Sequence, residues 1–184
     1  DFTLHPHWSV STIIKGIPEP KNFRQGSKNS FDRNASRAGA NWEFLDELRK
    51  KWKGNLIVKG VMDAIDANRI QNAGIDAIWV SNHGGRQLDG SPPALLALPK
   101  IRDSVGPSMP LIFDSGVRSG EDIVKALALG ANFVMLGRPI MIAIAASSEK
   151  GLNDYLSLLK EEIEVVMAQL GLKDLSKISG DVLY

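Results

Sequence analysis

The sequence predicts an α/β fold built on a parallel sheet, and three observations support this prediction. From residue 56 onward, short apolar runs alternate with stretches of helical periodicity, the pattern of consecutive βα units. The runs at 75–80 and 133–136 are apolar along nearly their whole length, as strands buried on both faces are. A glycine lies shortly before each of these two runs, where a helix would end. Right-handed crossovers between such units give parallel strands.

Strands and helices are expected to alternate through the main part of the chain. The strands are expected at 56–58, 75–80, 110–113 and 133–136. The helices are expected at 63–73, 94–105, 119–129, 139–146 and 152–171. Upstream, apolar residues between 42 and 52 recur at helical spacing, and a short helix is expected at 9–15. The tryptophans are expected to serve packing.

Two helices carry clear end signals. Ser119 is a suitable N-cap with Asp122 three residues later, and Gly130 follows the end of the same helix. Gly74 is a suitable C′ glycine for the helix at 63–73. These signals fix the boundaries at which each helix gives way to the next strand.

The chain is expected to hold a loop-rich entry segment at 1–40 and one half-domain at 41–184. A doubly wound sheet usually has a glycine-rich loop after its first strand, and the segment 59–62 is not one. A TIM (β/α)8 barrel places its chemistry at the carboxyl ends of its strands, where the reactive residues of this chain lie. Eight units need about 250 residues. We therefore predict four βα units, the C-terminal half of such a barrel.

Composition excludes several classes of function. The chain has no cysteine, which excludes disulfides, thiolate catalysis and cysteine-based zinc sites. Its net charge of +1 gives no bulk attraction to nucleic acid, so no nucleic-acid partner is expected. No apolar run approaches the roughly 20 residues of a spanning helix. The first residues lack a methionine and an apolar core, so we expect the chain to begin as a processed or truncated product would.

The charge is unevenly distributed along the chain. Residues 1–60 hold 11 lysines and arginines against 6 acidic residues, an excess of +5. Such a segment is suited to contact an anionic membrane surface, although a solvated loop region has the same composition.

The loop at 81–89 is the most informative segment, because it follows a predicted buried strand and contains a histidine and an arginine. His83 is able to take a proton, and Arg86 is able to hold a carboxylate. A metal ligand and a structural histidine are the alternatives for His83, and a salt-bridge arginine is the alternative for Arg86. No second histidine or carboxylate stands at helical spacing from His83, so no metal is expected.

Two later loops are suited to phosphate. The segment 114–120 follows the third strand and opens a helix, whose N-terminus offers free N–H groups. Gly116 allows close approach of a ligand to the backbone, and Arg118 adds donors. Gly137 and Arg138 repeat the pattern after the fourth strand. Plain turns with surface arginines are the alternative. Lys59, at the end of the first strand, either neutralises charge on a ligand or pairs with a carboxylate.

These segments together resemble one family. Lys59-Gly60, the run Ser81-Asn82-His83-Gly84-Gly85-Arg86-Gln87-Leu88-Asp89, Asp114-Ser115-Gly116-Val117-Arg118 and Gly137-Arg138 are similar to the FMN-dependent L-2-hydroxy acid dehydrogenases and oxidases. That family includes glycolate oxidase, L-lactate dehydrogenase and mandelate dehydrogenase. The resemblance covers nearly the whole chain.

The resemblance implies FMN as cofactor and a role for each site residue. His83 would take the hydroxyl proton of the substrate while hydride passes from its α-carbon to the flavin, and Arg86 would hold the substrate carboxylate. Lys59 would stabilise the reduced flavin ring, with Ser81 near the flavin. The ribityl and phosphate site would be formed by Asp114, Ser115, Gly116, Val117, Arg118, Gly137 and Arg138.

Departures from the family pattern shape the remaining expectations. The first four βα units are absent, together with the tyrosines that contact substrate and the aspartate that orients the catalytic histidine. We expect them on a second polypeptide, and we expect a homotetramer of whole barrels. Asp114-Ser115-Gly116 stands where many oxidases have Asp-Gly-Gly, and Gly85 stands where many have alanine. The resemblance therefore implies a dehydrogenase acting on a lactate- or mandelate-like acid. It also implies a cytoplasmic protein with peripheral contact at the inner face of the membrane.

Two other functions fit the residues less completely. One is a different phosphate-binding barrel enzyme, such as an isomerase or an IMP-dehydrogenase-like protein, and the absence of cysteine counts against the latter. The other is a non-catalytic half-barrel that binds a partner or a phosphate ligand.

Overall fold

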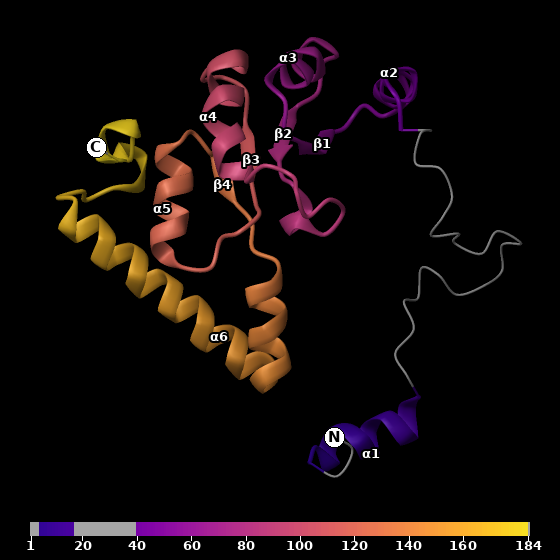
Figure 1. Ribbon diagram of the computed structural model, residues 1–184, viewed down its shortest axis with the longest axis vertical. Coiled ribbons are helices and arrows are strands. Elements are labelled where there is room, and N and C mark those ends of the chain that lie inside the picture. The colour runs from indigo at the N-terminus through magenta and orange to yellow at the C-terminus, as the bar shows by residue number, and fades with distance from the viewer. Residues whose placement is uncertain (1–3, 17–39, 184) are drawn as a thin grey trace, which may run out of the picture. The chain divides into compact units, whose positions relative to one another are not determined.

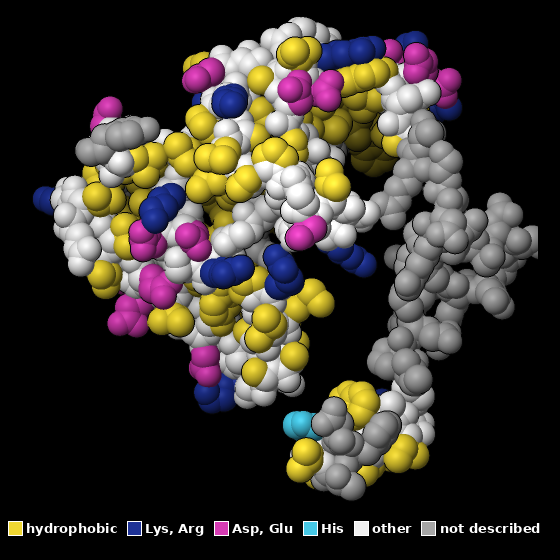
Figure 2. Space-filling model, viewed as in Figure 1, with side chains coloured by type: hydrophobic (Ala, Val, Ile, Leu, Met, Phe, Trp, Pro, Cys, Tyr) yellow, Lys and Arg dark blue, Asp and Glu magenta, His cyan; other side chains and the backbone are white. Residues whose placement is uncertain are grey.

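The computed structural model describes residues 4–16 and 40–183, and the chain divides into two compact units, Asp1–Phe44 and Leu45–Tyr184. In the first unit, α1 spans Pro6–Lys15, with the proline at a helix start and Gly16 beyond its end. The predicted short helix is thus confirmed and begins earlier than expected. Several of its large apolar side chains are on the surface: Trp8 is 57% exposed, Ile13 75% and Ile14 76% (Figure 2). Most of the expected loop-rich segment lies outside the described residues.

The second unit contains a parallel four-stranded sheet with the order β1-β2-β3-β4 (Figure 1). The strands are β1 (Ile57–Val61), β2 (Ala77–Val80), β3 (Leu111–Phe113) and β4 (Phe133–Val134). From Trp42 onward the helices are α2 (Trp42–Lys51), α3 (Ala64–Asn72), α4 (Ala94–Val105), α5 (Gly120–Ala128) and α6 (Arg138–Gln169). The predicted succession of βα units is confirmed, with strand ends within a few residues of those expected.

The predicted Ser119 cap is confirmed, and α3 begins with a cap of the same kind. The Ser119 side chain accepts a hydrogen bond from the Asp122 N–H at 3.2 Å, as expected of an N-cap. Asp63 caps α3 in the same way, accepting from the N–H groups of Ile65 and Asp66. Gly130, beyond α5, has a φ of 103°, a conformation that side chains other than glycine rarely adopt.

Helix α6 bends sharply at Ser147 and Ser148, whose backbone angles are not helical. The bend separates the two helices that the sequence predicts at 139–146 and 152–171. The α6 helix packs along α5 (Figure 1), and the contact is close at Gly120, where a Cβ atom would lie 2.6 Å from the Glu162 Cβ. No helix in the described ranges is long and apolar enough to cross a membrane.

The two faces of the sheet differ. Ile78, Val80, Leu111 and Phe113 are almost completely buried and form the core beneath α3, α4 and α5. The opposite face carries one row of paired residues, Lys59, Trp79, Ile112 and Phe133. On that face Phe133 is 60% exposed. One face of the sheet is thus packed and the other is open in the described structure.

Arg102 ties the ends of several elements together from α4. Its guanidinium donates hydrogen bonds to the carbonyls of Gly106, Met109 and Gly130 and to the side-chain oxygen of Asn132, at 2.6 to 3.0 Å. Desolvation of the guanidinium lowers the pKa of Arg102. This clasp holds the turn before β3 and the turn before β4 in place, at the amino ends of these strands.

Candidate active site

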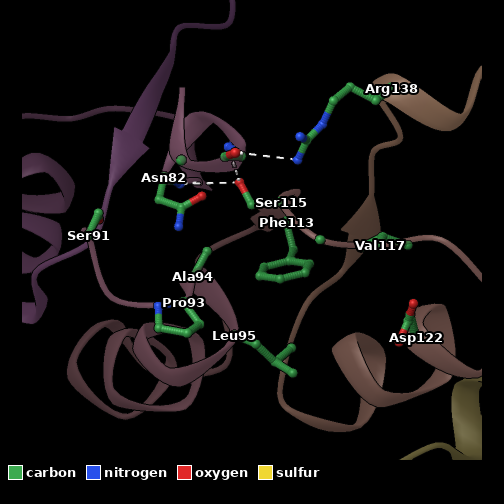
Figure 3. Close-up of a pocket in the computed structure, with 13 residues that line it drawn as sticks. Asn82, Ser91, Pro93, Ala94, Leu95, Phe113, Ser115, Val117, Asp122 and Arg138 are labelled. Carbon is green, nitrogen blue, oxygen red and sulfur yellow. Dashed lines mark hydrogen bonds between the residues drawn. The ribbon is translucent and has the colours of Figure 1, made fainter. Parts of the chain in front are cut away.

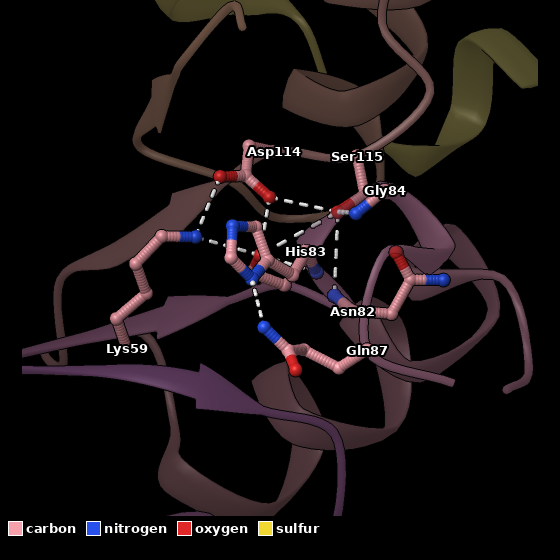
Figure 4. A network of polar contacts seen from close by, with 8 residues as sticks. Lys59, Asn82, His83, Gly84, Gln87, Asp114 and Ser115 are labelled. Carbon is pink, nitrogen blue, oxygen red and sulfur yellow. Dashed lines mark hydrogen bonds and ion pairs between the residues drawn. The ribbon is translucent and has the colours of Figure 1, made fainter. Parts of the chain in front are cut away.

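Lysine, serine and aspartate side chains meet at the carboxyl edge of the sheet. Lys59 lies on β1, Ser81 directly follows β2, and Asp114 directly follows β3. Because neighbouring parallel strands end at the same edge, residues far apart in the sequence become neighbours here. Figure 4 shows the Lys59 and Asp114 side chains meeting, with the ring of His83 beside them.

An ion pair links the first and third strands. Lys59 Nζ lies 2.8 Å from Asp114 Oδ2 and 2.8 Å from the Ser81 hydroxyl oxygen. Partial burial of Asp114 works to raise its pKa, but hydrogen bonds from Lys59, Ser81 and Ser115 and the charge of Lys59 outweigh it. The pKa of Asp114 is therefore lowered, and the carboxylate stays ionised at neutral pH.

The two serine hydroxyls use all of their hydrogen-bonding capacity. Ser115 donates to Asp114 Oδ1 at 2.8 Å and accepts from the N–H groups of Asn82 and Gly84, each at 3.2 Å. Ser81 also donates to Asp114 Oδ1, and it accepts from Lys59 and from the His83 N–H at 3.1 Å. A hydroxyl has one donor position and two acceptor positions, and all three are filled in each of these serines.

The predicted catalytic loop forms a short 3-10 turn over His83–Gly85. The His83 ring is on the surface, and its Nδ1 lies 3.5 Å from the amide nitrogen of Gln87. Arg86 follows the turn, donates its backbone N–H to the His83 carbonyl at 3.2 Å, and is exposed. The structure thus brings Lys59, Ser81, Asp114 and Ser115 into one network and attaches the His83 loop to it through backbone groups.

Trp79 is a site residue that the sequence reasoning assigned only to packing. Lys59 Nζ lies 4.3 Å from the centroid of its ring, a cation–π distance. The indole N–H is buried and has no hydrogen-bond partner among the described residues. The sequence offered one signal for this role. Trp79 stands two residues before Ser81 in an extended segment, and alternate residues face the same side.

A cavity of about 370 Å³ lies between the loops that follow β2 and β3. Its lining includes Ser115, Gly116, Val117 and Arg138, four of the residues expected at a phosphate site. Figure 3 shows the Arg138 side chain reaching across to the opposite loop, where it donates to the Gly84 carbonyl at 3.3 Å. The same cavity is also lined by Asp122.

The expectation of free N–H groups at the start of α5 is wrong for two of them. The Gly120 N–H donates to Glu162 Oε2 at 2.6 Å, and the Asp122 N–H is taken by Ser119. The Arg118 N–H donates to Asp122 at 3.0 Å. Side chains therefore occupy these donors, and the Glu162 and Asp122 carboxylates disfavour an anion there. The Arg118 side chain itself is exposed.

The second predicted phosphate loop differs at its helix start. Gly137 is the N-cap of α6, which has no side-chain cap, and Gly137 and Arg138 are both exposed. A Cβ atom at Gly137 or at Gly116 would meet nothing within 4 Å, so the backbone at both points faces open space. Within the described ranges, no three His, Cys, Asp or Glu side chains are grouped as metal ligands would be.

Comparison with known proteins identifies the family. The model of the FMN-dependent dehydrogenases matches residues 1–184. The chain belongs to the FMN-dependent dehydrogenase family. It is 41% identical to (S)-mandelate dehydrogenase of Pseudomonas putida over 190 residues, covering 100% of this chain and 48% of that protein. It is 38% identical to an L-lactate dehydrogenase of Acinetobacter baumannii over 189 residues, covering 98% of this chain and 49% of that protein.

Solved structures give the same relationship. A monotopic membrane protein, (S)-mandelate dehydrogenase, superposes with a TM-score of 0.88 at 40% identity, covering 98% of this chain and 49% of that one. A mandelate oxidase superposes with a TM-score of 0.71 at 40% identity, covering 74% and 39%. The chain spans about half the length of these relatives, which are TIM-barrel flavoenzymes. The predicted family and half-barrel fold are confirmed.

The residues present fit FMN, the cofactor of the family. Lys59 uses two of its three N–H groups within the described structure, which leaves a cationic donor for the flavin ring. The open backbone at Gly116 and Gly137 leaves room for a phosphate group, and the exposed Arg118 and Arg138 guanidiniums are suited to bind one.

Proposed function

We propose that this chain supplies half of the active site of an enzyme that uses FMN to oxidise an L-2-hydroxy acid to the 2-oxo acid. The observation that carries the proposal is the network that joins Lys59, Asp114 and the His83 loop at one edge of the sheet. The named relatives act on mandelate and lactate, which favours a lactate- or mandelate-like substrate.

Two residues of the loop would act on the substrate. His83 takes the hydroxyl proton, for which its exposed ring is suited. Arg86 binds the substrate carboxylate through its planar pair of donors, which fixes the α-carbon relative to His83. A backbone hydrogen bond from Arg86 to His83 links the base and the clamp within one turn. FMN, when bound, supplies the two-electron acceptor.

The remaining site residues would hold the cofactor. Lys59 provides positive charge for the flavin ring, and Ser81 lies beside that charge at 2.8 Å. Backbone and guanidinium donors, offered around the cavity between the loops, bind the ribityl chain and the phosphate. The residues proposed to form this ribityl and phosphate site are Asp114, Ser115, Gly116, Val117, Arg118, Gly137 and Arg138.

A second half-barrel would cover the open face of the sheet. Phe133 and Ile57 are 60% and 45% exposed on the two outer strands, and a closed barrel would bury both. We propose that the other four βα units are supplied by a second polypeptide, and that whole barrels assemble as a homotetramer. Mass spectrometry of the intact protein tests whether a second polypeptide is present. A second species matching the other half is expected, and a single species near 20 kDa would contradict it.

The proposed reaction type is that of a dehydrogenase. Gly85 has a φ of 76°, and a Cβ atom there would lie 3.4 Å from Asp89 Oδ1. Alanine, which many oxidases of the family have at this position, would be strained in this loop. Relatives of both types match the chain, so measurement with oxygen as acceptor decides between them.

We also propose a cytoplasmic protein that contacts the inner face of the membrane peripherally. Support comes from the exposed Trp8, Ile13 and Ile14 of α1 and from the relative described as a monotopic membrane protein. Flotation with vesicles containing anionic lipid is the test. Replacing Ile13 and Ile14 by serine should release the protein, and equal flotation of the variant would contradict the proposal.

A visible spectrum tests the proposed activity. Protein that contains this chain and its other half should be yellow, and L-lactate or (S)-mandelate should bleach the flavin absorption anaerobically while the opposite enantiomers do not. Rapid recolouring in air would identify an oxidase instead. A colourless folded protein would favour the non-catalytic half-barrel.

A further inference from the structure

The loop that carries His83 has an unusual backbone. Three successive residues have positive φ: His83 at 58°, Gly84 at 63° and Gly85 at 76°. Glycine adopts such angles freely, but a histidine does so at a cost of about 1 kcal/mol or more. A conformation of this kind persists only where the surrounding structure holds it.

The hydroxyl oxygens of two serines hold this loop. The N–H groups of Asn82 and Gly84, on either side of His83, both donate to the Ser115 hydroxyl at 3.2 Å. The His83 N–H donates to the Ser81 hydroxyl. Ser115 lies beyond β3 and is more than 30 residues away in sequence, so it fixes the loop relative to a neighbouring strand.

Ser115 is itself held in a conformation that favours glycine, with a φ of 88°. Glycine would adopt this angle without strain, as Gly116 does at 90°. The side chain of Ser115 offsets that strain, because its hydroxyl donates to Asp114 and accepts from two loop N–H groups. Through this hydroxyl the negative charge of Asp114 strengthens the hold on the loop.

We propose that Ser115 is a positioning residue for His83, whose loop it fixes through the N–H groups of Asn82 and Gly84. This rests on the proposed function for the role of His83 as base, and it adds a second task to the cofactor contact proposed for Ser115. Without the hydroxyl, two partly buried N–H groups lose their acceptor and the loop samples other conformations.

Two variants separate the hydroxyl from the strain. Ser115→Ala removes the hydroxyl and keeps the strained backbone, whereas Ser115→Gly removes both. Ser104→Ala is the matched control, since Ser104 donates a similar hydrogen bond to the Ala64 carbonyl at 2.9 Å, away from the site. The FMN-loaded protein with both barrel halves is used for hydrogen–deuterium exchange, FMN binding, steady-state kinetics and thermal unfolding.

Both Ser115 variants should speed exchange of the Asn82 and Gly84 amides about tenfold, the effect of losing one such bond. With FMN at saturation, they should lower kcat about tenfold with KM within twofold. Ser115→Gly should do so without lowering the melting temperature, since it also relieves strain. Ser104→Ala should change neither exchange in the loop nor kcat.

Three results would overturn the proposal. They are unchanged loop exchange in both variants, weakened FMN binding with unchanged exchange, or a fall in kcat that only parallels a fall in melting temperature. A wild-type protein that oxidises no hydroxy acid would refute the proposed function alone. The exchange measurement would then still decide whether Ser115 holds the loop.

Discussion

Replacing Asp114 by asparagine should disrupt the network at the sheet edge more than its similar shape suggests. The carboxylate accepts from Lys59 on one oxygen and from the hydroxyls of Ser81 and Ser115 on the other. An asparagine presents one oxygen and one NH2 group in their place. With NH2 toward Lys59, it faces an ammonium. With NH2 toward the serines, it faces hydroxyls whose acceptor positions are already used.

The first orientation loses the hydrogen bond from Lys59, and the second loses the hydrogen bonds from both serines. Bonds to charged groups contribute about 1.5–3 kcal/mol each. The Lys59 side chain is 40% exposed, so solvent screening reduces the contribution of its bond. The less costly orientation loses one such bond, so the expected loss in the free energy of unfolding is about 1–2 kcal/mol.

Urea denaturation of the wild type and Asp114→Asn measures this loss. Asp103→Asn is the control, since Asp103 is exposed, and it should stay within about 0.5 kcal/mol of wild type. Exchange of the His83 amide should rise in Asp114→Asn, because Ser81 then donates to a neutral oxygen or loses its acceptor. A loss below about 0.5 kcal/mol for Asp114→Asn would refute the argument that the hydroxyls are saturated.

Three further predictions concern packing and pH. Arg102→Leu should lower the free energy of unfolding by about 3 kcal/mol in urea, because carbonyls near two strands lose their donor, and a loss under 1 kcal/mol would contradict the clasp. Gly120→Ala should lower the free energy of unfolding by about 1–3 kcal/mol in thermal unfolding, since its Cβ would lie 2.6 Å from the Ile163 nitrogen. Gly180→Ala, whose Cβ would lie 3.8 Å from its nearest neighbour, should be nearly neutral, and equal effects of the two changes would refute the close contact. Because the pKa of Asp114 is lowered, its ionised form stabilises the fold above pH 3.8, its ordinary pKa, and this stability is lost as the pH falls through the lowered value. The wild type should therefore lose stability below about pH 4 more steeply than Asp114→Asn, and parallel curves would contradict this.

Much of the fold could be predicted from the sequence because local signals agree with the tertiary arrangement. The apolar runs form adjacent parallel strands, and Ser119 caps its helix as its spacing with Asp122 suggests. The division near residue 147 was also predicted, with helices expected at 139–146 and 152–171, and α6 bends between them.

The side-chain connections within the site could not be predicted in the same way. The sequence placed Lys59, Ser81 and Asp114 at strand ends, but their mutual contacts depend on the register between strands, which no local pattern encodes. The engagement of the Gly120 N–H by Glu162 was missed for a similar reason, since the carboxylate comes from α6, 42 residues away.

The central claim is that the His83 loop, held at the sheet edge, carries the chemistry of a flavin-dependent hydroxy acid oxidation. Stopped-flow measurement of anaerobic flavin bleaching by the active hydroxy acid tests it most directly, with His83→Asn compared to wild type and to His7→Asn, a change at a histidine of α1. The account predicts bleaching about 10²–10⁴-fold slower in His83→Asn, with FMN still bound, and an unchanged rate in His7→Asn. Bleaching of His83→Asn within threefold of the wild-type rate would contradict it.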